Sequence, residues 1–246
     1  ERGMKSRTAR NNGRFGGNHD VSHARSSGMV ERVGLAEATI RATATRTPRL
    51  LVIAGSSGTG KSSTARRILL ERDFTRCVST DAIREVLRTT DAERTRPALH
   101  RSSFSLGGTG DAVLDWLETC DELEQGVRAT VERARREGVD LLLEGVHVVP
   151  MDRLLDAWRQ DGGVAVGVVL RVDDEARHEA MLREREEASW RRADRYIASL
   201  DRIPTIQDGL IDRAKVAGWP IIDVDRQDEV KRILHHLDLA WNALQA

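Results

Sequence analysis

The sequence predicts an α/β fold, in which a five-stranded parallel sheet is flanked by helices. Short apolar runs alternate with longer helix-like runs from residue 50 onward, as expected for parallel strands joined by crossover helices. A glycine-rich turn over residues 55–62 joins the first strand-like run to the first helix-like run. A chain of 246 residues, 39% of them hydrophobic, is long enough to bury the core of one such domain, with room for a small appendage.

The predicted strands begin with the wholly apolar run Leu50–Ala54. The five runs read as strands cover residues 50–54, 76–79, 140–144, 164–171 and 220–224. The helices fall between them. In the longest, apolar residues recur at helical spacing, as at Leu123, Val127 and Val131. The predicted helices cover residues 61–72, 81–89, 111–137, 151–160, 174–188, 190–218 and 227–244. Residues 90–110 are a long connection, and such loops are often functional.

Three domain segments are predicted. Residues 1–28 are rich in Arg, Asn, Gly and Ser, and are expected to form a disordered basic tail because they have too few apolar residues to fold. Residues 29–48 are expected to be a helix and linker, with one helix over Val30–Thr45 and Pro48 ending the linker. Residues 49–246 form the main domain. A basic arm that touches nucleic acid is the alternative for the tail.

Composition indicates which partners and which cellular compartment to expect. The 39 basic residues balance the 39 acidic residues, so nothing global favours nucleic acid. No apolar stretch is long enough to cross a bilayer, and no signal peptide opens the chain. Cys77 and Cys120 lack the spacing of a metal or redox site and are expected to be reduced thiols. The expectation is a cytoplasmic protein with no membrane partner.

The turn over residues 55–62 reads Gly-Ser-Ser-Gly-Thr-Gly-Lys-Ser, the pattern of a phosphate-binding loop between a strand and a helix. Its glycines let backbone N–H groups converge, and the helix start adds a positive dipole end. Lys61, expected to be exposed, would reach the β- and γ-phosphates of ATP or GTP, and Ser62 would ligate Mg²⁺. The candidate nucleotide-binding residues are Gly55, Ser57, Gly58, Thr59, Gly60, Lys61, Ser62 and Ser63. The fold class is therefore a P-loop NTPase fold; the alternative is a plain Gly/Ser turn.

Two carboxylates are candidates for catalysis beside Lys61. Asp81 follows the second predicted strand, and Glu144 ends the third. Ligands of open α/β sheets lie beyond the carboxyl ends of the strands, so both should approach the phosphate loop. Each could hold Mg²⁺ or take the proton of an acceptor hydroxyl, and the sequence does not decide which is the base. The alternatives are that Thr80 or Asp81 only caps a helix and that Glu144 is a turn residue.

Candidate acceptor-binding residues lie on the predicted 81–89 helix and in the long connection. Arg84 and Arg88 are four residues apart, share a helix face and could clamp an anion. His100, Ser102 and Ser103 place further donors in the loop. The alternative for the two arginines is a solvated helix surface.

A helical lid is predicted around residues 182–196. Its arginines would cover the transferred phosphate and exclude water. The candidates are Arg183, Arg185, Arg192 and Arg195. The alternative is an exposed helix with many salt bridges.

Several motifs resemble those of 2-phosphoglycerate kinases. The more specific are Thr-Asp-Ala-Ile-Arg-Glu-Val-Leu-Arg at 80–88 and Glu-Gly-Val-His at 144–147. The other matching segments are 52–62, 99–104, 148–150, 195–196, 203–207 and 217–222, and the resemblance covers about residues 50–236.

This resemblance implies an adenylate-kinase-like core and ATP-dependent, Mg²⁺-dependent phosphorylation of 2-phosphoglycerate to 2,3-bisphosphoglycerate. Asp81 and Glu144 would arrange Mg²⁺ and the acceptor hydroxyl. It adds His147 to the candidate acceptor-binding residues Arg84, His100, Ser102 and Ser103. ATP is preferred over GTP on the resemblance alone.

Three other functions stay open at this point. The chain could be a kinase of a secondary metabolite or antibiotic-like hydroxyl compound, a nucleotide-dependent regulatory module, or a nucleic-acid kinase that uses the basic tail, although a nucleic-acid partner is not expected. The partner expected is a small acidic substrate, and a homodimer is left open.

Overall fold

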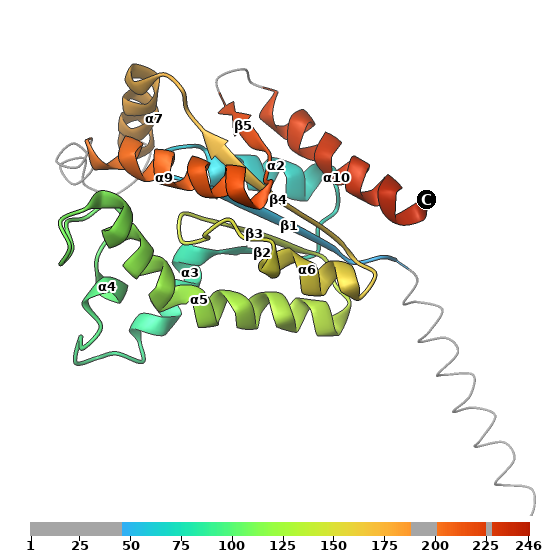
Figure 1. The fold of residues 1–246 in the computed structure, drawn as a ribbon, viewed down its shortest axis with the longest axis horizontal. Helices are drawn as coiled ribbons and strands as arrows, with labels where there is room; N and C mark the ends of the chain where they lie inside the picture. The colour runs from blue at the N-terminus through green and yellow to red at the C-terminus, as the bar shows by residue number, and fades with distance from the viewer. Residues whose placement is uncertain (1–45, 188–200, 225–227) are drawn as a thin grey trace, which may run out of the picture. The chain divides into compact units, whose positions relative to one another are not determined.

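A computed structural model describes residues 46–187, 201–224 and 228–246 of this chain (Figure 1). The chain divides into two compact units, Glu1–Arg46 and Thr47–Ala246. The fold described below is that of the second unit. The tail predicted at 1–28 and most of the helix and linker predicted at 29–48 lie outside the described residues and stay predictions.

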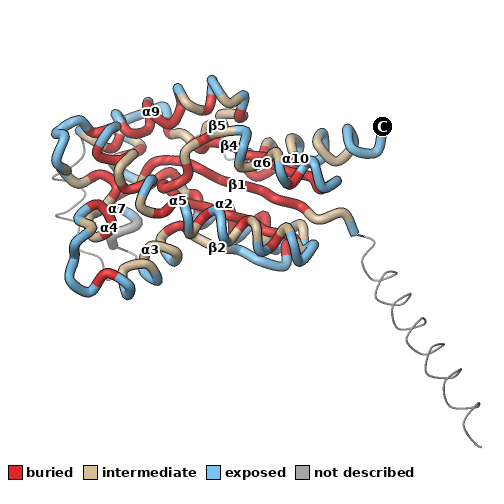
Figure 2. Tube along the Cα trace, turned by 60° about the horizontal axis from the view of Figure 1, so that its bottom comes forward, coloured by how far each residue is buried: buried red, intermediate tan, exposed pale blue. Residues whose placement is uncertain are grey.

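The described core is one parallel sheet of five strands in the order β2-β3-β1-β4-β5. The strands are β1 (Arg49–Gly55), β2 (Cys77–Ser79), β3 (Leu141–Gly145), β4 (Val164–Arg171) and β5 (Ile221–Asp223). β1 lies between β3 and β4, and every one of its residues is buried, as the tube of Figure 2 shows. The predicted five-stranded parallel sheet is confirmed, and the strand bounds agree within one residue.

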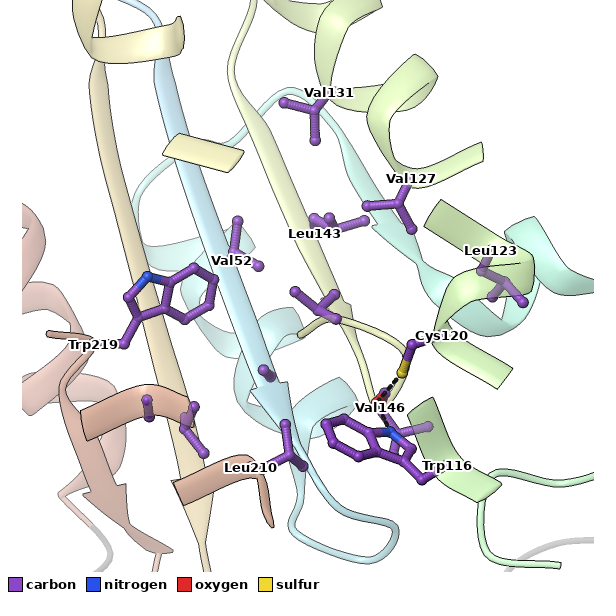
Figure 3. Close-up of a cluster of buried hydrophobic side chains, with 14 of the residues drawn as sticks. Val52, Trp116, Cys120, Leu123, Val127, Val131, Leu143, Val146, Leu210 and Trp219 are labelled. Carbon is purple, nitrogen blue, oxygen red and sulfur yellow. Dashed lines mark hydrogen bonds between the residues drawn. The ribbon is translucent and has the colours of Figure 1, made fainter. Parts of the chain in front are cut away.

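Helices cover both faces of the sheet. Apolar residues of α5 (Ala112–Glu137), α6 (Arg153–Gln160) and α9 (Arg202–Ala217) pack on one face. Those of α2 (Lys61–Glu71) and α10 (Glu229–Gln245) pack on the other. In Figure 3, Val52 and Leu143 on the first face lie between Trp219 on one side and the α5 residues Leu123, Val127 and Val131 on the other. The other helices in the described part of the chain are α3 (Thr80–Arg88), α4 (Pro97–His100) and α7 (Glu175–Glu187).

Local signals explain where the helices begin and end. Asp111 caps α5 by accepting hydrogen bonds from the N–H groups of Val113 and Leu114, and Gly138 ends it with a φ of 62°. Such a left-handed position favours glycine. Ser79 caps α3 by accepting from the N–H of Ala82, so the capping role considered for Thr80 or Asp81 is wrong.

Two predicted helices need comment, and one helix was not predicted. The connection over residues 90–110 contains the single helical turn α4, too short for a periodicity to reveal. The helix predicted at 190–218 is described only as α9, from Arg202, because residues 188–200 lie outside the described part of the chain. The helix predicted at Val30–Thr45 lies outside it as well. None of the helices that the structure describes is long and apolar enough to cross a membrane.

Trp219 packs directly on the backbone of β4. A Cβ atom added to Gly167 would lie 2.4 Å from two ring carbons of Trp219. Trp219 is 4% exposed, so its ring has little room to retreat. We therefore expect Gly167→Ala to lower the free energy of unfolding by about 1–3 kcal/mol through overpacking. Urea denaturation checks this, with Gly108→Ala as the control because nothing lies within 4 Å of that position. Equal losses in the two variants would contradict the close approach.

Candidate active site

The phosphate loop connects β1 to α2 and is bent by two glycines. Gly58 and Gly60 have φ values of 84° and 74°, which only glycine adopts readily. Gly60 is the N-cap of α2 and supplies no side-chain cap. The N–H groups at the start of α2 therefore receive no hydrogen bond from a side chain of the N-cap residue, and N–H groups at a helix N-terminus can bind phosphate.

Lys61 is the first residue of α2 and is only 8% exposed, so the expectation of an exposed loop residue was wrong. Its Nζ atom donates a hydrogen bond to the carbonyl of Ser56 at 2.6 Å. Thr59 Oγ1 donates to the same carbonyl at 3.0 Å. The ammonium group is therefore folded back over the loop, where it can neutralise bound phosphate.

Ser62 and Glu144 meet beside the phosphate loop. The parallel register sets Glu144 opposite Ile53 on one side and Ser79 on the other. Glu144 is 6% exposed, and its Oε1 atom accepts a hydrogen bond from Ser62 Oγ at 2.9 Å. A hydroxyl and a carboxylate oxygen are donors that suit a hard divalent cation such as Mg²⁺. The described residues contain no group of three His, Cys, Asp or Glu side chains that could hold a metal. Mg²⁺ at phosphate sites typically uses one or two carboxylates together with phosphate oxygens and water.

The turn that follows Glu144 and Gly145 is held by a hydrogen bond from α5. Trp116 of α5 donates its indole N–H to the carbonyl of Val146 at 2.7 Å, as Figure 3 shows. Trp116 is fully buried. A buried donor and a buried acceptor satisfy each other here, which fixes the path of residues 144–147.

Asp81 lies in the first turn of α3, two residues after the Ser79 that pairs with Glu144. Its side chain is 44% exposed, and its Oδ1 atom lies 3.1 Å from the guanidinium of Arg84. Arg84 is largely buried and also donates to the carbonyl of Arg101 at 3.5 Å. The structure thus brings Asp81, Arg84 and the long connection together at the edge of the site.

Arg88 and His100 both make hydrogen bonds to other residues of the protein. Arg88 Nε donates to the carbonyl of Leu99 at 2.9 Å, and the guanidinium pairs with Glu85. His100 Nε2 lies 2.9 Å from Asp91 Oδ2. Hydrogen bonds led by that of Thr95 lower the pKa of Asp91 to about 2, so it is ionised at neutral pH. Binding of an acceptor by either predicted residue would have to compete with these bonds.

The two predicted serines lie next to this scaffold. Ser103 is buried, and Ser102 is half-buried with its carbonyl accepting from the N–H of Ser105 at 3.0 Å. Their acceptor-binding role stays a prediction.

His147 is packed behind Asp81. Its Nδ1 atom lies 3.1 Å from Thr80 Oγ1 and 3.9 Å from Asp81 Oδ1. Its Nε2 atom is buried without a hydrogen-bond partner among the described residues. Thr80 in turn leaves no room at Gly145, where an added Cβ atom would lie 1.8 Å from Thr80 Oγ1. His147 therefore lies where it can set the position of α3, and its predicted contact with an acceptor is untested.

The predicted lid lies mostly outside the described residues. Arg183 is on the exposed side of α7, where its Nε donates to Glu179 Oε1 at 3.0 Å. This matches the alternative of a salt-bridged helix for that residue. The side chain of Arg185 lies outside the described part, as do Arg192 and Arg195, so their lid role stays a prediction.

Sequence reasoning missed two features of the structure. A cavity of about 410 Å³ adjoins the phosphate loop between α2, α7 and the end of β5. It is lined by Thr59, Gly60, Ser63, Thr64, Arg67, Arg177, Met181, Val224 and Glu229. A larger hollow of about 680 Å³ lies between α5 and α6, and of the candidate residues only His147 lines it. We place the site at the smaller cavity, because that cavity contains the phosphate loop.

The second missed feature is Asp115, a fully buried carboxylate in α5. Burial alone would raise its pKa, but hydrogen bonds from Thr109, Gly107 and Arg202 hold the pKa well below its usual range. Arg202 also donates to the carbonyl of Phe104 at 3.0 Å. Asp115 thereby ties residues Gly107 and Thr109 of the long connection, and the start of α9, to α5. The signal available in sequence was weak, because an isolated aspartate in a helix resembles a surface residue.

A family model described as "AAA domain" matches residues 50–205. Over 192 residues the chain is 35% identical to a protein named 2-phosphoglycerate kinase from Thermococcus kodakarensis, an alignment of 75% of this chain and 64% of that protein. It is 32% identical over 200 residues to one from Pyrococcus horikoshii, covering 78% and 65%. The chain thus spans just under two thirds of these relatives. A gluconokinase from Sinorhizobium meliloti superposes with a TM-score of 0.47 at 20% identity, covering 80% and 97%.

Burial makes His147 a source of acid sensitivity. Desolvation, followed by the charge of Arg84, lowers its pKa from 6.5 to about 3. Between these values the unfolded chain binds a proton that the native chain does not, so stability falls as the pH drops below about 6.5. The expected loss is about 1.4 kcal/mol at one pH unit below 6.5. Urea denaturation of the wild type and of His147→Gln at pH 7.5 and 5.5 measures it; a difference between the proteins that does not change with pH would contradict it.

Proposed function

Because this chain belongs to the AAA domain family and is similar to 2-phosphoglycerate kinases, we propose that it is an ATP-dependent kinase of a small acidic acceptor. The acceptor proposed is 2-phosphoglycerate, and the product is 2,3-bisphosphoglycerate. The observation that carries the proposal is the junction of the phosphate loop with a buried acid, through the hydrogen bond from Ser62 to Glu144. That junction places a cation-binding pair next to a phosphate-binding turn.

The nucleotide half of the site would hold Mg²⁺ and ATP. Backbone N–H groups of the loop and the ammonium of Lys61 bind the β- and γ-phosphates. Ser62 and Glu144 would hold Mg²⁺, which neutralises phosphate charge when bound. The cavity of about 410 Å³ beside the loop has room for the rest of the nucleotide.

The acceptor half of the site is assigned to Asp81 and Arg84. Glu144 is buried against Ser62, whereas Asp81 is half-exposed and ion-paired to Arg84. This contrast supports metal binding for Glu144 and proton transfer for Asp81. The γ-phosphoryl group passes to the acceptor hydroxyl, the hydroxyl proton goes to the Asp81 carboxylate, and ADP leaves. Arg84 can turn its charge toward the carboxylate or phosphate of the acceptor.

The direct test is phosphoryl transfer by the purified full chain. We expect 2,3-bisphosphoglycerate to form from ATP, Mg²⁺ and 2-phosphoglycerate, as detected by mass spectrometry. Lys61→Met should reduce turnover by about 10²–10³-fold, because it removes a charge that stabilises the transferring phosphate. Lys215→Met is the matched control, since Lys215 is exposed and pairs only locally with Asp212.

The outcomes separate the alternatives. Transfer to other hydroxy acids but not to 2-phosphoglycerate would contradict the proposed acceptor, but it would still support a small-molecule kinase. ATP hydrolysis without transfer to any acceptor would favour a regulatory module. Transfer from GTP at the same rate as from ATP would remove the assigned nucleotide preference.

Asp81→Asn separates binding from chemistry. The variant should bind ATP normally but transfer phosphate about 10²–10⁴-fold more slowly, because the group that accepts the proton is lost. Single-turnover kinetics with saturating ATP measures the transfer step. Asp212→Asn, a change of an exposed acid on α9 that pairs with Lys215, is the control. Unchanged transfer in Asp81→Asn would move the base to another group.

A further inference from the structure

Helix α7 lies against the phosphate loop and also lines the adjoining cavity with Arg177 and Met181. It follows β4 and stands at the end of the sheet where β1 and β4 end (Figure 1). A Cβ atom added to Gly58 would lie 2.5 Å from Leu182 and 3.3 Å from His178 Nε2. A Cβ atom added to Gly60 would lie 3.8 Å from Met181. One face of α7 therefore contacts the loop at both of its left-handed glycines.

The polar contact of this face is made by His178. Its Nε2 atom lies 2.7 Å from the carbonyl oxygen of Ser57, and the residue is 3% exposed. A carbonyl oxygen can only accept, so Nε2 carries the proton and donates. The bond joins residues 121 positions apart in sequence. It is a tertiary contact between α7 and the phosphate loop.

The Ser57 carbonyl belongs to the same peptide unit as the N–H of Gly58. In a planar trans peptide these two groups point in opposite directions. A donor that fixes the carbonyl toward α7 therefore directs the Gly58 N–H to the opposite side of the loop. Gly58 has a φ of 84° and no side chain, so this peptide can rotate more easily than one between two ordinary residues.

We propose that His178 is a positioning residue that holds the Ser57–Gly58 peptide with its N–H directed at the nucleotide phosphates. The inference rests on the proposed function for the role of the loop, and adds a residue outside the glycine-rich motif that completes it. A rotated peptide would present a carbonyl oxygen to the phosphates, which repel it. Preorganised N–H donors are effective because they need no reorientation when charge arrives.

Substitutions at position 178 separate the hydrogen bond from the packing. His178→Phe keeps the ring and removes the donor, whereas His178→Gln places an amide donor near the position of Nε2. His178→Asn is polar but too short to reach the Ser57 carbonyl. We expect ATP affinity, measured by calorimetry on the full chain with Mg²⁺, to fall at least tenfold in the Phe and Asn variants. It should stay within threefold of the wild type in the Gln variant and in Glu184→Gln, an exposed control on the same helix.

AMP binding distinguishes the positioning role from a purely structural one, because a structural defect would weaken AMP binding as well. It lacks the β- and γ-phosphates, so its affinity should change less than threefold in all variants. An equal loss of ATP and AMP affinity, or unchanged ATP affinity in folded Asn and Phe variants, would overturn the positioning role. If the Phe variant does not fold, the ATP affinities of the Asn and Gln variants can be compared to test the proposal. These binding measurements need no acceptor, so they can be interpreted even if the protein does not phosphorylate 2-phosphoglycerate.

Discussion

The parallel pairing of β1 with β3 is the constraint on which the site depends. It sets Glu144 level with Ile53, two residues before β1 gives way to the phosphate loop. Parallel strands end at the same edge of a sheet, so a loop after one strand and an acid at the end of the next must be neighbours. The hydrogen bond from Ser62 to Glu144 is the visible product of this register. Because a slip of one residue would turn Glu144 to the other face, the buried leucines of β3 maintain the site as well as the core.

The site is built in layers behind its exposed groups. Asp81 is half-exposed, but Thr80 and His147 behind it are buried, and Gly145 has no space for a side chain. Trp116 then holds the turn at Val146 from α5. Close packing of this kind allows little independent movement of α3 against β3. The positions of Asp81 and Arg84, the groups proposed to face the acceptor, are thus fixed by residues that need not touch it.

The strands, the principal described helices and the phosphate loop could be predicted because each leaves a local mark. Apolar runs mark the strands, and the glycine and lysine pattern marks the loop. Glu144 was predictable as the acid that ends a run of leucines. Contacts that depend on distant residues were not predictable. Nothing near Arg88 or His100 in sequence reveals that one binds the Leu99 carbonyl and the other binds Asp91. Lys61 was expected to be an exposed loop residue, but α2 begins at that residue and its ammonium group folds back over the loop.

Glu144 lies in β3 and Asp81 in the helix that follows the adjacent strand β2, and the surroundings of the two acids differ. Glu144 is buried, and the hydroxyl it accepts from belongs to the first turn of α2. A carboxylate in such a place is costly unless a cation or several donors satisfy it, which fits a metal ligand better than a mobile proton acceptor. Asp81 keeps solvent contact, and its Oδ1 atom lies 3.1 Å from the guanidinium of Arg84. The same arginine would also attract an anionic acceptor to that edge. This difference supports the two roles proposed for the acids, metal binding for Glu144 and proton transfer for Asp81.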